Sequence, residues 1–201
     1  GTLQVSGGSA VSDSSIIGIT AGATFELLSN ETIGVLTSNA TGDVNLNANT
    51  LTIGGLGMGV GASVDGAITG TGSLVYNASG LTQTFSGANT YTGDTTITNG
   101  TFALGANDII DDASDVIING GTLSMQTFND TAASVSLQSG SVTGTGTLTS
   151  AGTYGQSGGT LDSGATVNAG GAKTLEGGTI AGTLGGAGAV FPAGDAGGRH
   201  E

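Results

Sequence analysis

The amino-acid sequence predicts an all-β protein, a right-handed parallel β-helix (β-solenoid) of about nine coils. Three observations lead to this prediction. Glycine makes up 41 of the 201 residues, with one proline and no cysteine. A phrase made of a small residue, threonine and an apolar residue recurs along the chain. Short β-branched runs are bounded by Asn-Gly and Gly-Gly pairs, which turn a chain at little cost.

The composition favours many short strands joined by tight turns. Glycine exceeds its usual share of roughly 7% almost threefold, but the sequence lacks the proline content and the three-residue period of collagen. Hydrophobic residues are 36% and charged residues 8% of the chain, so the chain also differs from a charged, disordered one. Because the apolar residues are spread along the whole sequence, they fit a narrow and continuous core.

The recurring phrase sets the expected coil length. Its steps from the first occurrence to Leu148 are 22, 26, 23, 28, 21 and 25 residues, and the later steps are irregular. A longer echo relates residues 1–27 to residues 100–125. Coils of this size cannot bury an apolar side alone, but stacked coils share one core. The apolar residue of the phrase is Leu3, Phe25, Leu51, Phe102, Leu123, Leu148, Leu161, Ile180 or Leu184, with a weaker form at Leu74.

The clearest strands are predicted at residues 51–53, 96–98, 116–118 and 147–149, which are β-branched and apolar. Turns are expected at 99–100, 119–121 and 158–159, because Asn and Gly tolerate positive φ. A β-sandwich also has short strands, but it requires no recurring phrase and is therefore less favoured. We expect one solenoid domain over residues 1–190 and a glycine-rich polar tail over 191–201.

The charge excludes some classes of partner. Fifteen acidic and two basic residues give a formal net charge of −13. Such a surface repels nucleic acid, because binding to phosphates depends on Lys and Arg. No stretch approaches the ~20 apolar residues of a transmembrane helix, so membrane insertion is not expected. There is no signal peptide at Gly1 either, so the chain reads as a mature piece or an excised fragment.

One segment carries a family likeness. Residues 72–104 read GSLVYNASGLTQTFSGANTYTGDTTITNGTFAL. They resemble the passenger-associated transport repeat of bacterial autotransporters. SGANTYTG at 86–93 matches the centre of that repeat closely, and TTI at 95–97 and GTF at 100–102 continue it. Asp94 stands where the repeat commonly has glycine. The likeness is strong over 72–125 and diffuse over the rest of 1–190.

The resemblance implies a secreted β-helical passenger at the bacterial cell surface, translocated through an outer-membrane barrel. Its implied location is extracellular. The expected partners are neighbouring β-helix segments or copies of the same chain, with a host or matrix surface as another candidate. The sequence itself contains no translocator barrel.

The chain offers few residues for chemistry. Its basic residues are Lys173 and Arg199, and its single histidine is His200, so we expect no enzyme, no catalytic residues and no cofactor. The one dense acidic group could hold calcium, since hard cations prefer several carboxylate and carbonyl oxygens. A solvated acidic corner is the interpretation we favour. The candidate calcium ligands are Asp108, Asp111, Asp112 and Asp115.

Three tyrosines leave two interpretations open. Tyr76, Tyr91 and Tyr154 could form platforms on which carbohydrate rings stack. We expect instead that each packs over the edge of a coil and keeps its hydroxyl group in water.

The sequence-based interpretation is a structural rod: an autotransporter-like passenger or adhesin stalk without catalysis. The alternative is the subunit of an extracellular filament, built by head-to-tail stacking of solenoids, because an open solenoid end leaves backbone groups unpaired. A polysaccharide-cleaving enzyme is less favoured. So is an ice-binding face, because the Thr-x-Thr pairs at residues 50–52, 96–98 and 147–149 do not recur in every coil.

Overall fold

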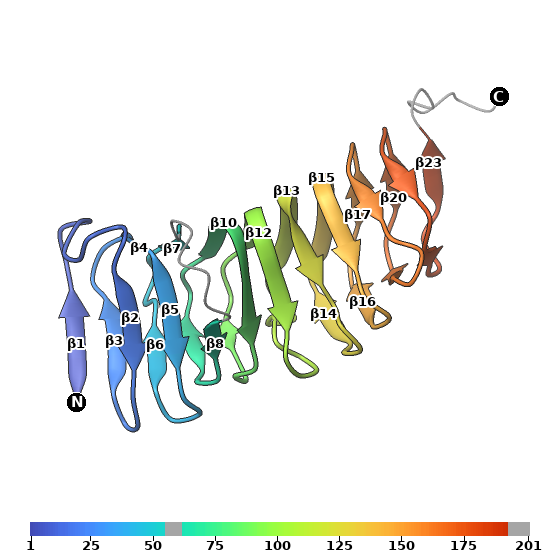
Figure 1. Ribbon diagram of the computed structural model, residues 1–201. Coiled ribbons are helices and arrows are strands. Elements are labelled where there is room, and N and C mark those ends of the chain that lie inside the picture. Colours follow the sequence, from blue (N-terminus) through green and yellow to red (C-terminus); the bar gives the residue numbers. More distant parts are fainter. Residues whose placement is uncertain (55–61, 193–201) are drawn as a thin grey trace.

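The protein is a parallel β-solenoid. A computed structural model describes residues 1–54 and 62–192, and every regular element in these ranges is a β-strand. Neighbouring strands pair in parallel, each with its counterpart one coil away, and the chain runs from one end of the rod to the other (Figure 1). The predicted all-β solenoid is therefore confirmed. It has about ten turns, one more than the sequence indicated.

Each coil contributes one segment to each of three faces. Face 1 holds β1 (Thr2–Val5), β3 (Thr24–Leu27), β6 (Asp43–Asn45), β9 (Ile68–Gly70), β11 (Thr90–Tyr91), β14 (Asp130–Ala132), β16 (Thr147–Ser150), β19 (Thr166–Ala169) and β22 (Thr183–Gly185). Face 2 holds β4 (Glu31–Ile33), β7 (Leu51–Ile53), β17 (Tyr154–Gln156), β20 (Lys173–Leu175) and β23 (Val190–Pro192). Face 3 holds β2 (Ile16–Ile19), β5 (Val35–Ser38), β8 (Ala62–Val64), β18 (Thr160–Leu161) and β21 (Thr179–Ile180).

Four long strands turn the corner from face 2 to face 3. They are β10 (Leu74–Phe85), β12 (Thr95–Leu104), β13 (Asp115–Ser124) and β15 (Ser134–Thr143). In β12 the corner falls at Asn99-Gly100, as the sequence predicted. Gly100 has φ of 74°, and a Cβ atom there would overlap the carbonyl oxygen of Ala78 in the previous coil. This corner therefore requires glycine for both its conformation and its space.

The recurring phrase lies on all three faces, and its spacing follows a rule. Steps of 21 to 23 residues keep the apolar residue on the same face, one coil further along; Phe102 and Leu123, for example, are register partners on face 3. Steps of 25 to 28 residues move it to the next face, as from Phe25 on face 1 to Leu51 on face 2. The alternating short and long steps in the sequence are therefore a real structural feature.

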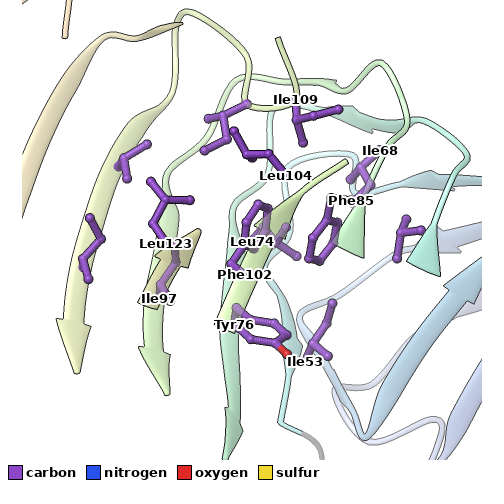
Figure 2. Packing of buried hydrophobic residues seen from close by; sticks show 14 of the residues in the cluster. Ile53, Ile68, Leu74, Tyr76, Phe85, Ile97, Phe102, Leu104, Ile109 and Leu123 are labelled. Atoms are coloured by element: carbon purple, nitrogen blue, oxygen red, sulfur yellow. The ribbon is translucent and has the colours of Figure 1, made fainter. Parts of the chain in front are cut away.

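The core is a narrow column that runs the length of the solenoid. Buried and less buried residues alternate in most of the inner strands, and in β12 Ile97 and Phe102 are completely buried. The aromatic centre of the column is formed by Tyr76, Phe85 and Phe102, whose rings lie close together in Figure 2. Tyr76 meets the two phenylalanine rings edge-on, with centroids 6.3 and 6.0 Å away.

The solenoid continues slightly beyond the end predicted for it. Phe191 and Pro192 belong to β23 and pair with Thr174 and Leu175 of β20. Both residues fall within the segment that the sequence assigned to the polar tail. The rest of that tail, residues 193–201, lies outside the described residues.

Candidate functional site

The four acidic residues proposed as calcium ligands do not converge on one point. Asp108 and Asp112 are exposed, and Asp111 and Asp115 are partly exposed. The Asp111 carboxylate accepts the N–H of Ala113 at 2.9 Å, which closes a local turn, and Asp115 accepts the Ser134 hydroxyl at 2.7 Å. Within residues 1–54 and 62–192, no group of three or more His, Cys, Asp or Glu side chains is placed to hold a metal ion.

A buried carboxylate that the sequence analysis overlooked lies directly behind this loop. Asp130 begins β14 and is 2% exposed. Its Oδ2 atom accepts the N–H groups of Ile109 at 2.9 Å and Ile110 at 3.1 Å, whereas its buried Oδ1 atom has no hydrogen-bond partner. Burial raises the pKa of Asp130 from its ordinary 3.8 to about 7; the backbone N–H groups of Ile110, Ile109 and Thr131 oppose this shift, and the charge of Asp108 adds to it.

A buried asparagine approaches the same backbone from the other side. Asn89 is 7% exposed and lies one coil before the loop. Its Oδ1 atom accepts the N–H of Ile68, and its Nδ2 atom donates to the carbonyl oxygen of Ile109, both at 2.8 Å. The N–H and C=O of Ile109 are therefore both bonded to side chains.

These side chains bridge an interruption of the sheet on face 1. The strands of this face form a five-stranded sheet that ends at β11 and a four-stranded sheet that begins at β14. The coil between them contributes residues 107–110, which form no strand. Asn89 and Asp130 connect this coil to its two neighbours in place of a continuous ladder, and on the Asp130 side the Asp108 N–H also donates to the Asn129 carbonyl oxygen at 3.1 Å and the Asn129 N–H to Asn107 Oδ1 at 2.8 Å. We call Asn89, residues 108–110 and Asp130 the seam.

A second carboxylate holds the first coil in the same way. Glu31 is 2% exposed, and its two carboxylate oxygens accept the N–H groups of Ala10 at 3.1 Å and Val11 at 3.3 Å. The asparagine before each of the two carboxylates also makes the same contact: Asn30 and Asn129 each accept a backbone N–H from the next coil at 2.8 Å. The signal was present in the sequence: Asn-Glu-Thr at 30–32 and Asn-Asp-Thr at 129–131 lie 99 residues apart, at the offset of the long echo.

Both expectations for the tyrosines are wrong. Tyr76, Tyr91 and Tyr154 are completely buried, so they offer no platform to a carbohydrate and keep no hydroxyl group in water. Each hydroxyl is satisfied inside the core, at the Leu81 carbonyl, the Thr95 hydroxyl and the Gln156 side chain respectively. Burial raises the pKa of Tyr76 to about 12 and that of the other two further.

Lys173 is buried as well. It is 2% exposed and lies in the inward row of face 2, in register with Tyr154 and Val190. Its Nζ atom donates to the carbonyl oxygens of Gly188 at 2.7 Å and Gly186 at 3.1 Å. Lys173 therefore fastens the last described coil. Arg199 and His200 lie outside the described residues.

An apolar hollow lies at the mouth of the core at the first coil. It has a volume of about 360 Å³ and includes Leu3, Ile19 and Phe25 in its lining. Leu3 points inward in register with the buried Phe25, but it is 55% exposed because no coil covers it in this structure. At the other end Val190, the inward register partner of Lys173, is likewise 55% exposed.

Within the described ranges, no helix combines the length and the hydropathy of a membrane span. Comparisons with protein-family models, with curated proteins and with solved structures found no match to this chain. The likeness of residues 72–104 to the autotransporter repeat consequently stays a prediction from the sequence.

Proposed function

We propose that the chain is a structural rod of a secreted bacterial cell-surface protein, an autotransporter-like passenger or adhesin stalk that carries out no catalysis. The observation that carries this proposal is the unbroken core. Buried apolar residues follow one another from Val5 in β1 to Ala169 in β19, and Leu175 and Leu184 pack against them, so each coil is held by the next. A structure of this kind transmits length and stiffness and needs no localised site.

The buried ionisable residues support a structural role. Asp130, Glu31 and Lys173 are ionisable side chains that the fold buries, and each is engaged with the backbone of a neighbouring coil. A general acid or base must reach a substrate. Here Asp130 Oδ2, both carboxylate oxygens of Glu31 and Lys173 Nζ are bonded to peptide groups of the rod itself.

The outer surface supports the same proposal. Its side chains are mostly short and polar, and several bond to the equivalent position one coil away. Gln4 donates to Glu26 at 2.8 Å, and Ser139 donates to Asn119 at 3.1 Å. Such cross-coil bonds add to the backbone ladder and stiffen the rod.

The location is tested with antibodies against the purified chain. Intact cells of the producing organism should be labelled in immunogold electron microscopy, and brief treatment of intact cells with protease should remove the label. Labelling that requires cell lysis would exclude a surface protein.

The absence of catalysis is tested separately. Incubation of the purified rod with pectin-like and other polysaccharides should release no reducing ends, and release above a heat-denatured control would contradict a passive rod.

The second candidate function is a filament subunit. The observation that favours it is the exposure of inward apolar residues on both terminal coils, Leu3 at one end and Val190 at the other. Another coil placed on either end would bury these side chains and pair the free strand edge. In the stalk that coil is a continuation of the same chain, whereas in the filament it is a second copy.

A further inference from the structure

We propose that the seam is a pH-sensitive joint in the rod, held most tightly while Asp130 is protonated and opened more readily once its carboxyl group ionises. The seam lies between the five-stranded and the four-stranded sheets of face 1. At this point of face 1 the side chains of Asn89 and Asp130, together with the bonds between residues 107–108 and Asn129, stand in place of a continuous strand ladder. The Asp130 carboxyl group holds two of the N–H groups there, so a change in its charge acts directly on the connection.

Asp130 is enclosed by the loop before it and by β16 behind it, which pairs with β14 and carries no ionisable side chain. Oδ2 is bonded to the Ile109 and Ile110 N–H groups, while Oδ1 is buried without a partner. A proton has a place on Oδ1 and leaves both bonds to Oδ2 intact. A negative charge, in contrast, is held away from water, and the N–H groups of Ile110, Ile109 and Thr131 offset only part of that cost.

Acidic groups surround the Asp130 carboxyl group. Asp108, on the same loop as Ile109, raises the pKa of Asp130. Tyr91 of β11 faces it from the other side, and the charges of Asp130 and Asp111 add to the rise that burial causes in the Tyr91 pKa. The ionisable neighbours of Asp130 among the described residues are thus acids, and an ionised Asp130 meets repulsion as well as desolvation.

Because the pKa of Asp130 is raised in the folded chain, the stability of the closed seam depends on pH. The pKa of Asp130 is about 7 in the folded chain and near 3.8 when the seam is open to water. A group with a raised pKa stabilises the closed form fully below the lower value, and this contribution is lost as the pH rises to the higher value. Opening of the seam should therefore become roughly tenfold more frequent for each pH unit between about 4 and 7.

Carboxyl carbon NMR on the intact wild-type chain tests the proposal directly. The Asp130 carboxyl signal should titrate with an apparent pKa near 7. Titration near its ordinary value would overturn the proposal. This measurement requires no variant, so it does not depend on whether a mutant folds.

Amide hydrogen exchange at the Ile109 and Ile110 N–H groups then locates the opening. After correction for intrinsic rates, their protection should fall between pH 4 and 7, relative to amides of β12 and β13 on face 2. Asp130→Asn keeps an oxygen acceptor for these N–H groups and should abolish the pH dependence. Asp94→Asn removes an exposed acid away from the seam and should leave it unchanged. The same pH dependence in Asp130→Asn as in wild type would overturn the proposal.

Discussion

Phe85 and Phe102 stack face to face across two neighbouring coils, with ring centroids 4.0 Å apart and ring planes 8° from parallel. The two residues are not register partners, because Phe102 pairs with Gln83 and Phe85 pairs with Leu104. The stack is therefore a diagonal contact between residues two register positions apart, and it joins two coils in addition to the backbone ladder (Figure 2).

Phe102→Ala should destabilise the rod by about 3–5 kcal/mol, because it removes a fully buried ring and leaves a cavity beside Phe85 and Tyr76. The denaturant midpoint, followed by circular dichroism, measures this change. Thr96→Ala on the outward side of the same strand is the matched control and should stay within about 0.5 kcal/mol of wild type. Equal midpoints for the two variants would contradict the stacked core.

Gly100→Ala should lower the stability of the rod, whereas Gly155→Ala should not. At Gly100 an added Cβ meets the Ala78 carbonyl oxygen and the backbone has positive φ, so the cost should exceed about 1 kcal/mol. At Gly155 a Cβ would meet no atom within 4 Å. Alanine there should be neutral or stabilising by up to about 1 kcal/mol, since it restricts the unfolded chain. Thermal melting of both variants decides, and a destabilised Gly155→Ala would show that the strand packs more tightly than described.

Glu31→Ala should loosen the first coil by about 1–3 kcal/mol, because the N–H groups of Ala10 and Val11 lose their acceptors. Hydrogen exchange at these two amides measures the effect. Glu31→Gln retains one carbonyl oxygen and should fall between Glu31→Ala and wild type. Unchanged protection of both amides in Glu31→Ala would mean that the carboxylate does not hold this coil.

Calcium should not change the melting temperature. The carboxylates of Asp108, Asp111, Asp112 and Asp115 do not converge, and a ligand that binds only the folded chain would raise its stability. Melting in millimolar calcium and in chelator should coincide. A higher melting temperature in calcium that disappears in the double variant Asp111→Asn, Asp112→Asn would restore the calcium site.

Sedimentation separates the stalk from the filament. A filament subunit should show a sedimentation coefficient that rises with concentration, since stacking buries apolar area worth about 25 cal/mol per Å². Leu3→Asp places a charge in the mouth of the core and should abolish the rise, whereas Asp111→Asn at the side of the rod should preserve it. The stalk proposal expects a wild-type monomer at every concentration, and that result would eliminate the filament.

The sequence predicted the class of fold because that class is a local property repeated many times. Residues 96–98 and 116–118 lie in β12 and β13 as expected, and Asn99-Gly100 makes the expected corner. These features depend on alternation and on glycine, both of which are visible over a few residues. The number of faces, in contrast, depends on where each strand pairs, and this cannot be read from one strand.

The seam could not be predicted for a related reason. Asp130 is an ordinary acidic residue within its own strand, and its role arises only because Ile109 and Ile110 lie beside it one coil earlier. The tyrosines were misjudged because the sequence does not reveal that Thr95 and Gln156 supply polar partners inside the core. In both cases the decisive contact joins polar atoms that the fold, and not the local pattern, brings together.

The placement of the recurring phrase on all three faces has a consequence for how such a chain can lengthen. A copied segment need not equal a whole turn, because a copy that is longer or shorter by one strand sets the phrase on the adjacent side with its apolar residue still pointing inward. Leu51 and Leu74 on face 2 and Phe102 and Leu123 on face 3 are two such settings of the same phrase. The phrase therefore suits each of the three faces and does not by itself fix the face on which a strand lies.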